Sequence, residues 1–164
     1  MGRTGKFSMS DMKKLQAMLK KIHDADKDAF LEACAKELAA RLMAKVIKRT
    51  PVGDYPKGSG RKGGTLKRGW TTQKSGSGAE GLKVRSARKF VDTLKVHKFG
   101  GVFVIEIENP IEYASYVEYG HRTATHKGWV PGRFMLTISE QEIQAIAPKV
   151  LEKKIMKFLG ECMK

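Results

Sequence analysis

The N-terminal third of the chain carries two helical patterns of hydrophobic residues. Apolar residues of Ser10–Ile22 recur every three or four positions and lysines occupy the remaining surface, so this segment is predicted to be a short amphipathic helix. A second, longer pattern predicts a helix that follows a cap at Asp24 or Asp26 and ends near Arg49. We expect the end there because Pro51 disfavours helical geometry at the residue before it and cannot extend the hydrogen-bond ladder.

The middle of the chain alternates glycine-rich stretches with short apolar runs. Residues 53–64 (GDYPKGSGRKGG) have no apolar periodicity, so they are predicted to form a flexible basic loop. The apolar runs that follow predict short strands. These runs are Leu66–Gln73, Leu82–Arg85 and Val91–His97.

The clearest strand pattern is Val102–Glu108. Phe103, Ile105 and Ile107 alternate there with residues of the other face, and a Gly-Gly pair at 100–101 predicts a hairpin turn from the preceding strand. One face is therefore expected to meet the helices and the other to be wetter.

The C-terminal part is predicted to be mainly helical. Tyr113–Tyr119 fits two helical turns closed by Gly120 in the left-handed conformation, and a turn-rich loop follows. From Phe134 the apolar spacing is helical again, and Ser139-x-x-Glu142 matches a capping box. Within this long helix, Pro148 predicts a kink or the start of a new segment.

These elements predict an α+β fold in which a small antiparallel β-sheet packs against an N-terminal helix and a long C-terminal helix. The length of 164 residues suits a single domain. Residues 1–26 are expected to form a basic arm and short helix, and residues 27–164 one domain with its basic loop at 53–64. No apolar run approaches the about 18 residues of a membrane span, so no membrane role is expected.

Charge is the strongest compositional signal. The chain has 32 Lys and Arg residues against 17 Asp and Glu residues, a formal net charge of +15. Such an excess attracts polyanions, which makes nucleic acid or an acidic protein surface a plausible neighbour. The alternative is that the lysines only keep an assembling protein in solution.

Motifs for catalysis or cofactor binding are weak. Gly58–Thr65 resembles a phosphate-binding loop, but Gly64 occupies the position of the essential lysine. His121 and His126 lack further ligands nearby for a zinc site. The two cysteines lie in apolar helical patterns and are expected to be packed thiols rather than a disulfide. We therefore expect no enzyme activity, no cofactor and no metal.

The basic loop and the run after it form the main candidate contact site. If all five basic residues met phosphates, affinity for DNA would fall with a log-log salt slope of about 4 to 5. The loop could instead become ordered against a neighbouring subunit. The residues are Lys57, Arg61, Lys62, Lys67 and Arg68.

Three segments, in their order along the chain, resemble a known family. Arg49–Val52 (RTPV) at a helix end leads into Gly64–Trp70 (GTLKRGW). Tyr113–Arg122 (YASYVEYGHR) is similar to the family's Ala-x-Tyr-Val-Glu-Phe-Gly-Thr segment, and Pro131–Leu136 (PGRFML) to its entry into a C-terminal helix. The family comprises the head-tail joining or tail-completion (neck) proteins of tailed bacteriophages, prophages and phage-tail-like particles. The resemblance covers residues 27–163.

The resemblance implies a non-enzymatic virion protein of the neck or proximal tail, assembled in the cytoplasm of the host bacterium. Its partners would be further copies of itself in a ring, expected to be a hexamer from the sixfold symmetry of the tail. Head-tail connector or adaptor proteins would bind on one side, and a tail terminator or tail tube protein on the other. Packaged DNA passes through such a ring, so the basic loop could face the lumen and contact phosphates without reading bases, or it could clasp an acidic patch on the next subunit.

The same segments supply candidate residues for an interface or for packing. Aromatic residues are enriched in both settings, and we expect the tyrosines to be mostly core residues. The set is Trp70, Tyr113, Tyr116, Tyr119, His121, Arg122, Trp129, Arg133 and Phe134. The alternatives to a virion role are a sequence-independent DNA-binding protein and a nuclease.

Overall fold

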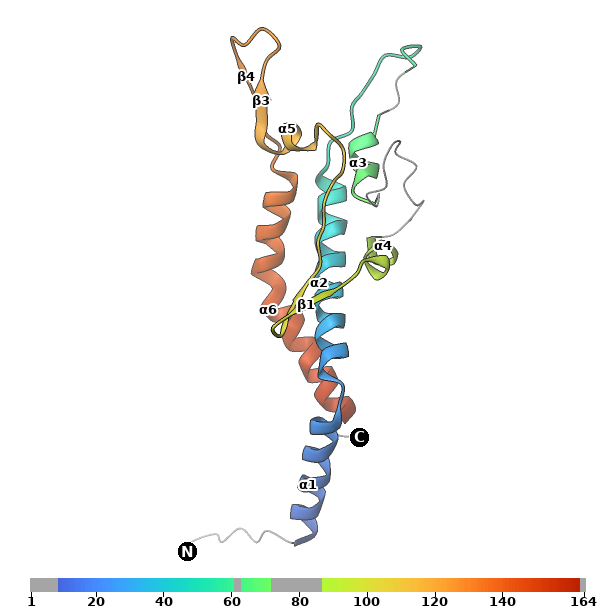
Figure 1. The fold of residues 1–164 in the computed structure, drawn as a ribbon, viewed down its shortest axis with the longest axis vertical. Helices are drawn as coiled ribbons and strands as arrows, with labels where there is room; N and C mark the ends of the chain where they lie inside the picture. The colour runs from blue at the N-terminus through green and yellow to red at the C-terminus, as the bar shows by residue number, and fades with distance from the viewer. Residues whose placement is uncertain (1–8, 61–62, 72–86, 163–164) are drawn as a thin grey trace, which may run out of the picture.

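The computed structural model describes residues 9–60, 63–71 and 87–162, and over these residues it is an elongated, mostly helical α+β structure (Figure 1). Two long helices, α2 (Lys27–Arg49) and α6 (Met135–Cys162), lie side by side along the molecule. Helix α1 (Met9–Asp24) extends from the far end of α2, beyond the body that α2 and α6 form. The predicted N-terminal and C-terminal helices are thus confirmed.

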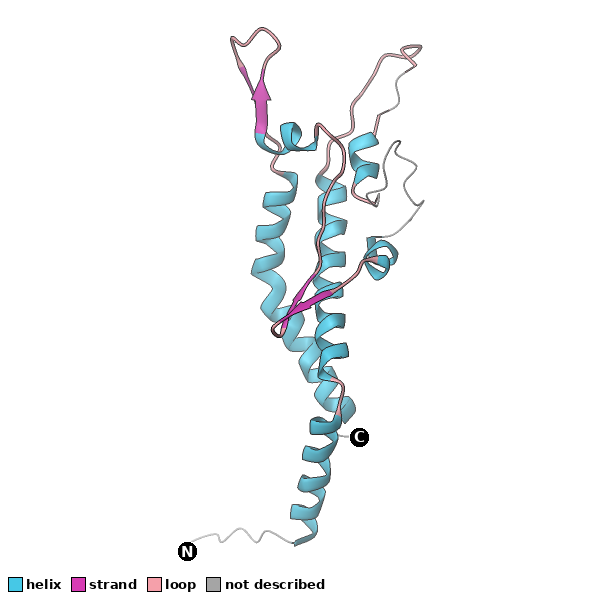
Figure 2. Cartoon of the chain, viewed as in Figure 1, coloured by secondary structure: helices cyan, strands magenta, loops and turns pink. Residues whose placement is uncertain are grey.

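The shorter elements decorate this pair of helices (Figure 2). They are α3 (Thr65–Gly69), α4 (Ala87–Thr93), β1 (His97–Phe99), β2 (Val102–Val104), α5 (Ala114–Tyr119), β3 (Gly120–Arg122) and β4 (Trp129–Pro131). Strands β1 and β2 pair antiparallel, as do β3 and β4, so the described residues contain two separate hairpins where a single small sheet was expected. The α+β class is confirmed.

Both ends of α2 follow from local chemistry. Asp26 is the cap, because its Oδ1 accepts a hydrogen bond from the Ala29 N–H at 2.9 Å. Thr50 ends the helix in an extended conformation, as expected for a residue that precedes Pro51. The Thr50 N–H still donates to the Val46 carbonyl at 2.9 Å, so the last turn is closed.

The core forms around the middle of α2. Met43 and Val46 are fully buried, and side chains from α3, α4 and α6 pack around them. These are Leu66, Trp70, Phe90, Val91 and Met135. The core is therefore built from helix contacts, with the β1–β2 hairpin adding half-buried residues at its edge.

Two of the predicted strands are wrong. Leu66–Gln73 begins in α3, and Val91–His97 begins in α4 and reaches β1 only at its last residue. A short apolar run does not by itself distinguish a strand from a buried helical turn. The buried residues are Leu66 and Gly69 in α3 and Phe90 and Val91 in α4, so each short helix buries one of its sides. The third run, Leu82–Arg85, lies outside the described residues.

The strand pattern of Val102–Glu108 is confirmed in its orientation and only partly in its pairing. Phe103, Ile105 and Ile107 are half-buried while their neighbours are exposed. Regular pairing stops at Val104 because β1 offers only three partners. Gly100 and Gly101 make the turn with φ values of 54° and 92°.

Ion pairs join α2 to its neighbours. Glu142 of α6 accepts from Lys45 Nζ at 2.5 Å and Arg49 Nη2 at 2.6 Å, and these bonds lower the pKa of its carboxyl. Burial raises the pKa of Glu37, but hydrogen bonds from Arg88 and Arg41 outweigh it, so the pKa is lowered overall. Glu37 thereby ties α4 to α2.

The capping box predicted at Ser139-x-x-Glu142 is wrong. Ser139 lies inside α6, where its Oγ donates to the Met135 carbonyl, and Glu142 forms the ion pairs with α2.

Pro148 lies within α6, which bends near its middle (Figure 1). Cys34 is buried and Cys162 half-buried, both as free thiols. No helix among the described residues is long and apolar enough to cross a membrane.

Candidate functional site

The end of the molecule opposite α1 is organised by one buried carboxylate. Glu118 of α5 is 5% exposed and caps the start of α6 from outside that helix. Its oxygens accept from the Leu136 N–H at 3.0 Å, the Thr137 N–H at 2.9 Å and the Thr137 hydroxyl at 2.8 Å. Negative charge is favourable at a helix N-terminus, where backbone N–H groups lack partners. Glu118 therefore takes the role that the sequence assigned to Ser139.

Two glycines let α5, the β3–β4 hairpin and α6 approach closely. A Cβ on Gly132 would lie 2.3 Å from the Glu118 carbonyl oxygen, and one on Gly120 would lie 2.5 Å from that of Val130. Gly120 has φ 88° and ψ 170°, so it is not in the left-handed helical conformation expected for it. The Phe134 N–H donates to the same Glu118 carbonyl at 3.0 Å. The junction is thus held by backbone contacts.

The turn-rich loop after Gly120 is a β-hairpin. His121 pairs with Val130 and Arg122 with Trp129. At the turn, the Thr123 N–H donates to the Gly128 carbonyl at 3.0 Å. The turn between Arg122 and Trp129 has six residues. The strongest sequence signals for a hairpin come from two-residue turns, so the sequence did not predict this one.

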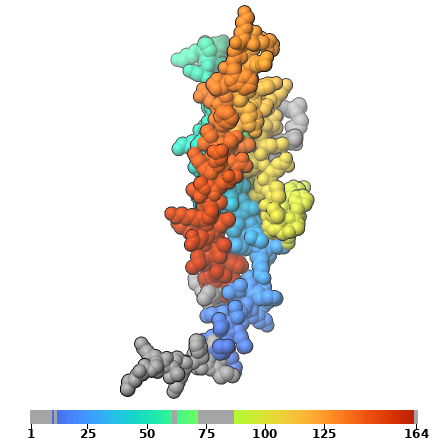
Figure 3. Space-filling model, turned by 90° about the vertical axis from the view of Figure 1, so that its left-hand side faces the viewer, coloured from blue at the N-terminus to red at the C-terminus, as the bar shows by residue number. Residues whose placement is uncertain are grey.

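This end presents aromatic side chains to solvent. The tyrosines are exposed, Tyr116 by 58% and Tyr119 by 62%, so the expectation that they lie mostly in the core is wrong. We define the aromatic surface as Tyr113, Tyr116, Tyr119, Trp129, Val130 and Phe134, all of them exposed. In the space-filling view the segments that carry it form the upper end of the molecule, next to the 51–60 segment (Figure 3). Large exposed apolar groups clustered on one end are typical of a protein interface.

A pocket of about 330 Å³ opens between the 51–60 segment and α5. Tyr113, Tyr116, His121 and Arg133 line one side of it. Val52 and Tyr55, which sequence reasoning missed, line the other. The ring of Tyr116 lies 5.9 Å from that of His121, whose buried Nδ1 has no hydrogen-bond partner among the described residues. The lining is mostly apolar, with the guanidinium of Arg133 among its polar groups.

The predicted basic site is dispersed. Lys57 is exposed in the loop, whereas Arg61 and Lys62 lie outside the described residues. Lys67 is half-buried on α3, and Arg68 bonds back to the Gly63 carbonyl and the Thr65 hydroxyl, each at 3.3 Å. Segment 53–60 is irregular and exposed, as expected.

Trp70 belongs to packing. It is 3% exposed, and its Nε1 donates to the Thr50 hydroxyl at 2.7 Å. That hydroxyl donates in turn to the Val46 carbonyl at 2.7 Å, so the segments RTPV and GTLKRGW meet in two linked buried hydrogen bonds. These bonds fix α3 on the end of α2.

Residues 9–60, 63–71 and 87–162 contain no group of three or more His, Cys, Asp or Glu residues that could hold a metal ion. Glu118, the most buried carboxylate at this end, has its oxygens engaged by α6. What this end offers is a braced apolar surface with a pocket beside it.

Comparison with known proteins connects these features to a family. No curated protein and no solved structure matches the chain. A family model described as "Bacteriophage HK97-gp10, putative tail-component" matches residues 13–120. The match begins within α1, ahead of the residue 27 at which the sequence resemblance began, and it covers more than half of the 164 residues. The chain therefore belongs to the HK97-gp10-like family of bacteriophage tail components.

Proposed function

We propose that this protein forms a homo-oligomeric ring, a hexamer to match the tail, in the neck or proximal tail of the virion. The ring completes the tail and joins it to the DNA-filled head. Membership of a phage tail family supports a structural role in the tail rather than a catalytic one. The neck location and the ring are our extension of that role.

The aromatic surface is the observation that carries this proposal. It comprises six large apolar side chains at one end of an elongated molecule, on a junction braced by Glu118. A surface that is rigid before binding loses little conformational freedom when a partner docks. In the proposed neck, this end meets a connector or adaptor protein, a tail terminator or tube protein, or the next subunit.

Deletion of the gene and negative-stain microscopy of the particles test the proposal. We expect separate heads and tails, or tails with malformed proximal ends, and rescue by the wild-type gene. Normally joined particles from the deletion strain would overturn the neck role.

Complementation with surface variants then tests the aromatic surface itself. Trp129→Ala combined with Tyr116→Ala should fail to restore joining, whereas Met156→Ala should restore it. Met156 on α6 is a matched control because it is 66% exposed and lies outside the aromatic surface. Full rescue by the double variant would show that this surface has no role in joining.

A second candidate function is sequence-independent DNA binding. The net charge of +15 and the exposed Lys57 favour it, either in the lumen of the ring or in the cell. Replacing Lys57, Arg61 and Lys62 by Ser should reduce the log-log salt slope of duplex binding by about 3. An unchanged slope would exclude the loop from DNA contact.

A further inference from the structure

A groove of about 370 Å³ lies between α2 and α6, and no residue of the aromatic surface lines it. Its lining is mainly cationic, and among the residues that the structure describes it includes one carboxylate, Glu37, and two apolar side chains, Ile146 and Val150. We call it the basic groove. Its cationic residues are Arg41, Lys149, Lys153, Lys154 and Lys157.

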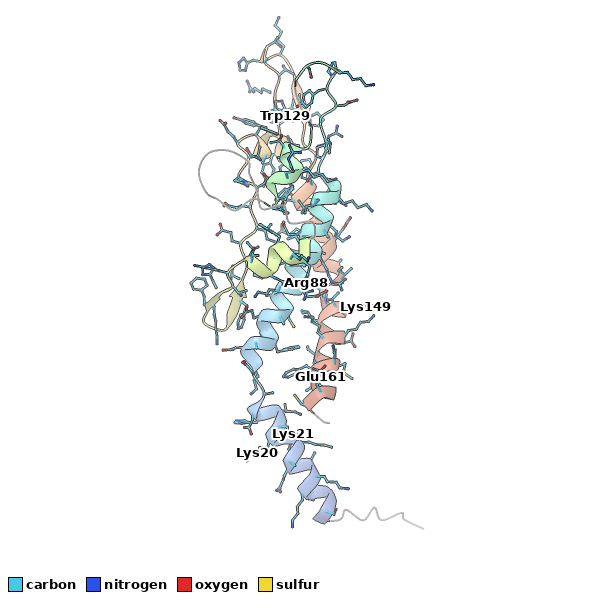
Figure 4. The ribbon with its side chains drawn as sticks, turned by 90° about the vertical axis from the view of Figure 1, so that its right-hand side faces the viewer. Lys20, Lys21, Arg88, Trp129, Lys149 and Glu161 are labelled. Carbon is cyan, nitrogen blue, oxygen red and sulfur yellow. The ribbon has the colours of Figure 1, made fainter. Side chains whose placement is uncertain are left out.

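Cations recur at a regular spacing along both helices. Residues four positions apart lie on one face of a helix, about 6 Å apart along its axis. Figure 4 shows Lys149 on α6 at about the same level along the molecule as Arg88 of α4. The two rows of cations are Arg41, Lys45 and Arg49 on α2 and Lys149, Lys153 and Lys157 on α6.

The lysines of the α6 row are accessible to a ligand. Lys149 and Lys153 are exposed, and neither forms an ion pair or a hydrogen bond with a residue that the structure describes. Lys157 is 79% exposed, and its Nζ lies 3.7 Å from a carboxylate oxygen of Glu161. An exposed ion pair of this kind contributes little free energy, so a ligand can displace it. Three ammonium groups on one side of α6 are therefore open to an anion.

The carboxylates near the basic groove do not neutralise it. Glu37 is shared by two arginines, and Glu142 is shared by a lysine and an arginine, so each of these carboxylates has two cationic partners. Glu152 is exposed about 60° around α6 from Lys149 and does not line the groove. The groove therefore keeps an excess of positive charge.

The composition of the basic groove suits phosphates better than a protein surface. Charged residues are depleted and aromatic residues are enriched in the centre of protein–protein interfaces, whereas interfaces with DNA are more polar and much more positively charged. The described lining of the groove contains no aromatic residue. Each strand of duplex DNA carries one phosphate per about 3.4 Å of helix axis, so lysines about 6 Å apart reach about every second phosphate.

We propose that the basic groove binds the phosphate backbone of double-stranded DNA. Lys149, Lys153 and Lys157 contact phosphates of one strand, and Arg41 faces them from α2. The contact is independent of base sequence, because bonds to phosphates position a protein on the duplex without reading bases. The inference rests on the DNA contact that accompanies the proposed neck role, and it places that contact on the two long helices instead of on segment 53–60.

The salt dependence of duplex binding by the purified full-length chain tests the groove. Binding is measured by fluorescence anisotropy of a labelled duplex of mixed sequence over a series of KCl concentrations. The combined variant Lys149→Gln, Lys153→Gln and Lys157→Gln should lower the magnitude of the log-log salt slope by about 2 to 3, because each lost phosphate contact removes about 0.9. A slope equal to that of the wild type would overturn the proposal.

The matched control removes the same charge from another surface. It combines Lys14→Gln, Lys20→Gln and Lys21→Gln, three exposed lysines of α1. Figure 4 shows Lys20 and Lys21 beyond the end of α6 that carries Glu161. The control should keep the wild-type slope. A fall equal to that of the groove variant would show that net charge, and not the groove, governs binding.

Chemical labelling of lysines gives an independent readout on the wild-type chain. The chain is acetylated with acetic anhydride, with and without the duplex, and the modified lysines are identified by mass spectrometry. DNA should reduce the labelling of Lys149 and Lys153, whereas Lys127 in the β3–β4 turn should react equally in both samples. Protection of Lys57 without protection of Lys149 would assign the DNA contact to segment 53–60 and overturn the groove.

The outcomes separate this contact from the proposed function, because duplex binding is measured on the purified chain and joining is measured on particles. A wild-type chain without salt-dependent duplex binding would overturn the groove and leave the neck role standing. Binding to poly-glutamate that requires the groove lysines, without duplex binding, would instead assign the groove to an acidic protein surface. Normally joined particles from the deletion strain, together with groove-dependent duplex binding, would overturn the neck role alone.

Discussion

The two ends of this molecule both expose apolar side chains, but they differ in how these are supported. At the aromatic end, Tyr116 and Trp129 stand on a junction held by Glu118 and by close glycine contacts. At the other end, Leu15 and Leu19 lie on a single projecting helix and are about half exposed in the part of the chain that the structure describes. One surface is supported by several elements of the fold, and the other stands on one helix.

This difference teaches how exposure should be interpreted in a subunit of an assembly. A braced surface can select a partner by shape, since little order remains to be gained on binding. A projecting amphipathic helix gains both burial and order when it docks. Mutations in the support of the braced end should therefore affect stability, whereas mutations of the exposed residues at either end should affect folding little.

The largest effect is expected inside the support of the braced end. Trp70→Ala should lower the free energy of unfolding by about 3 to 5 kcal/mol, because it empties a buried site and removes the bond to Thr50. Trp129→Ala should change it by less than about 0.5 kcal/mol, because that side chain is 60% exposed. Urea denaturation measures both. Equal losses would erase the distinction between core and surface tryptophans.

Removing the cap of α6 should have the next largest effect. Glu118→Ala takes away three acceptor contacts and should cost about 3 kcal/mol in chemical denaturation. Glu112→Ala, on an exposed residue just before α5, serves as the control and should change stability by less than about 0.5 kcal/mol. A Glu118→Ala protein as stable as the control would show that the aromatic end is not braced by this carboxylate.

A smaller effect should appear in the acid dependence of stability. The pKa of Glu142 is lowered in the folded state by Lys45 and Arg49, so its stabilisation is complete above the ordinary value of 4.5 and is lost as pH falls through the lower folded pKa. Glu142→Gln should therefore have a lower Tm than wild type at pH 7, with the difference shrinking below pH 4.5. A gap that stays constant down to pH 3 would contradict this ion-pair role.

The smallest effect on folding is expected at the open end. Leu19→Ala should change the free energy of unfolding by less than about 0.5 kcal/mol, since the side chain is already 58% exposed. Met43→Ala, with a side chain that is fully buried, should cost about 2 to 5 kcal/mol. Thermal unfolding of the two variants compares them directly. A large loss in Leu19→Ala would mean that α1 is part of the folded core.

Much of the fold was predictable where one local pattern is long. The helix of Lys27–Arg49 follows from more than six turns of apolar spacing, a cap and a proline. The runs at Leu66 and Val91 were too short for their period to be decided, and they form helical turns instead of strands. At the candidate site, the motif YASYVEYGHR was found from the sequence, but its tyrosines were assigned to the core because aromatic content alone does not show on which side of a helix burial occurs.

The sequence by itself determined the long helices, the outward and inward faces of the 102–108 segment and the family, because periodicity, caps and motifs are local properties of the chain. Only the tertiary structure decided which glutamate caps α6 and which aromatic residues remain exposed. Glu118 and Thr137 are 19 residues apart, and Lys45 and Glu142 are 97 apart. Contacts over such separations depend on how the elements pack, and no local pattern encodes them.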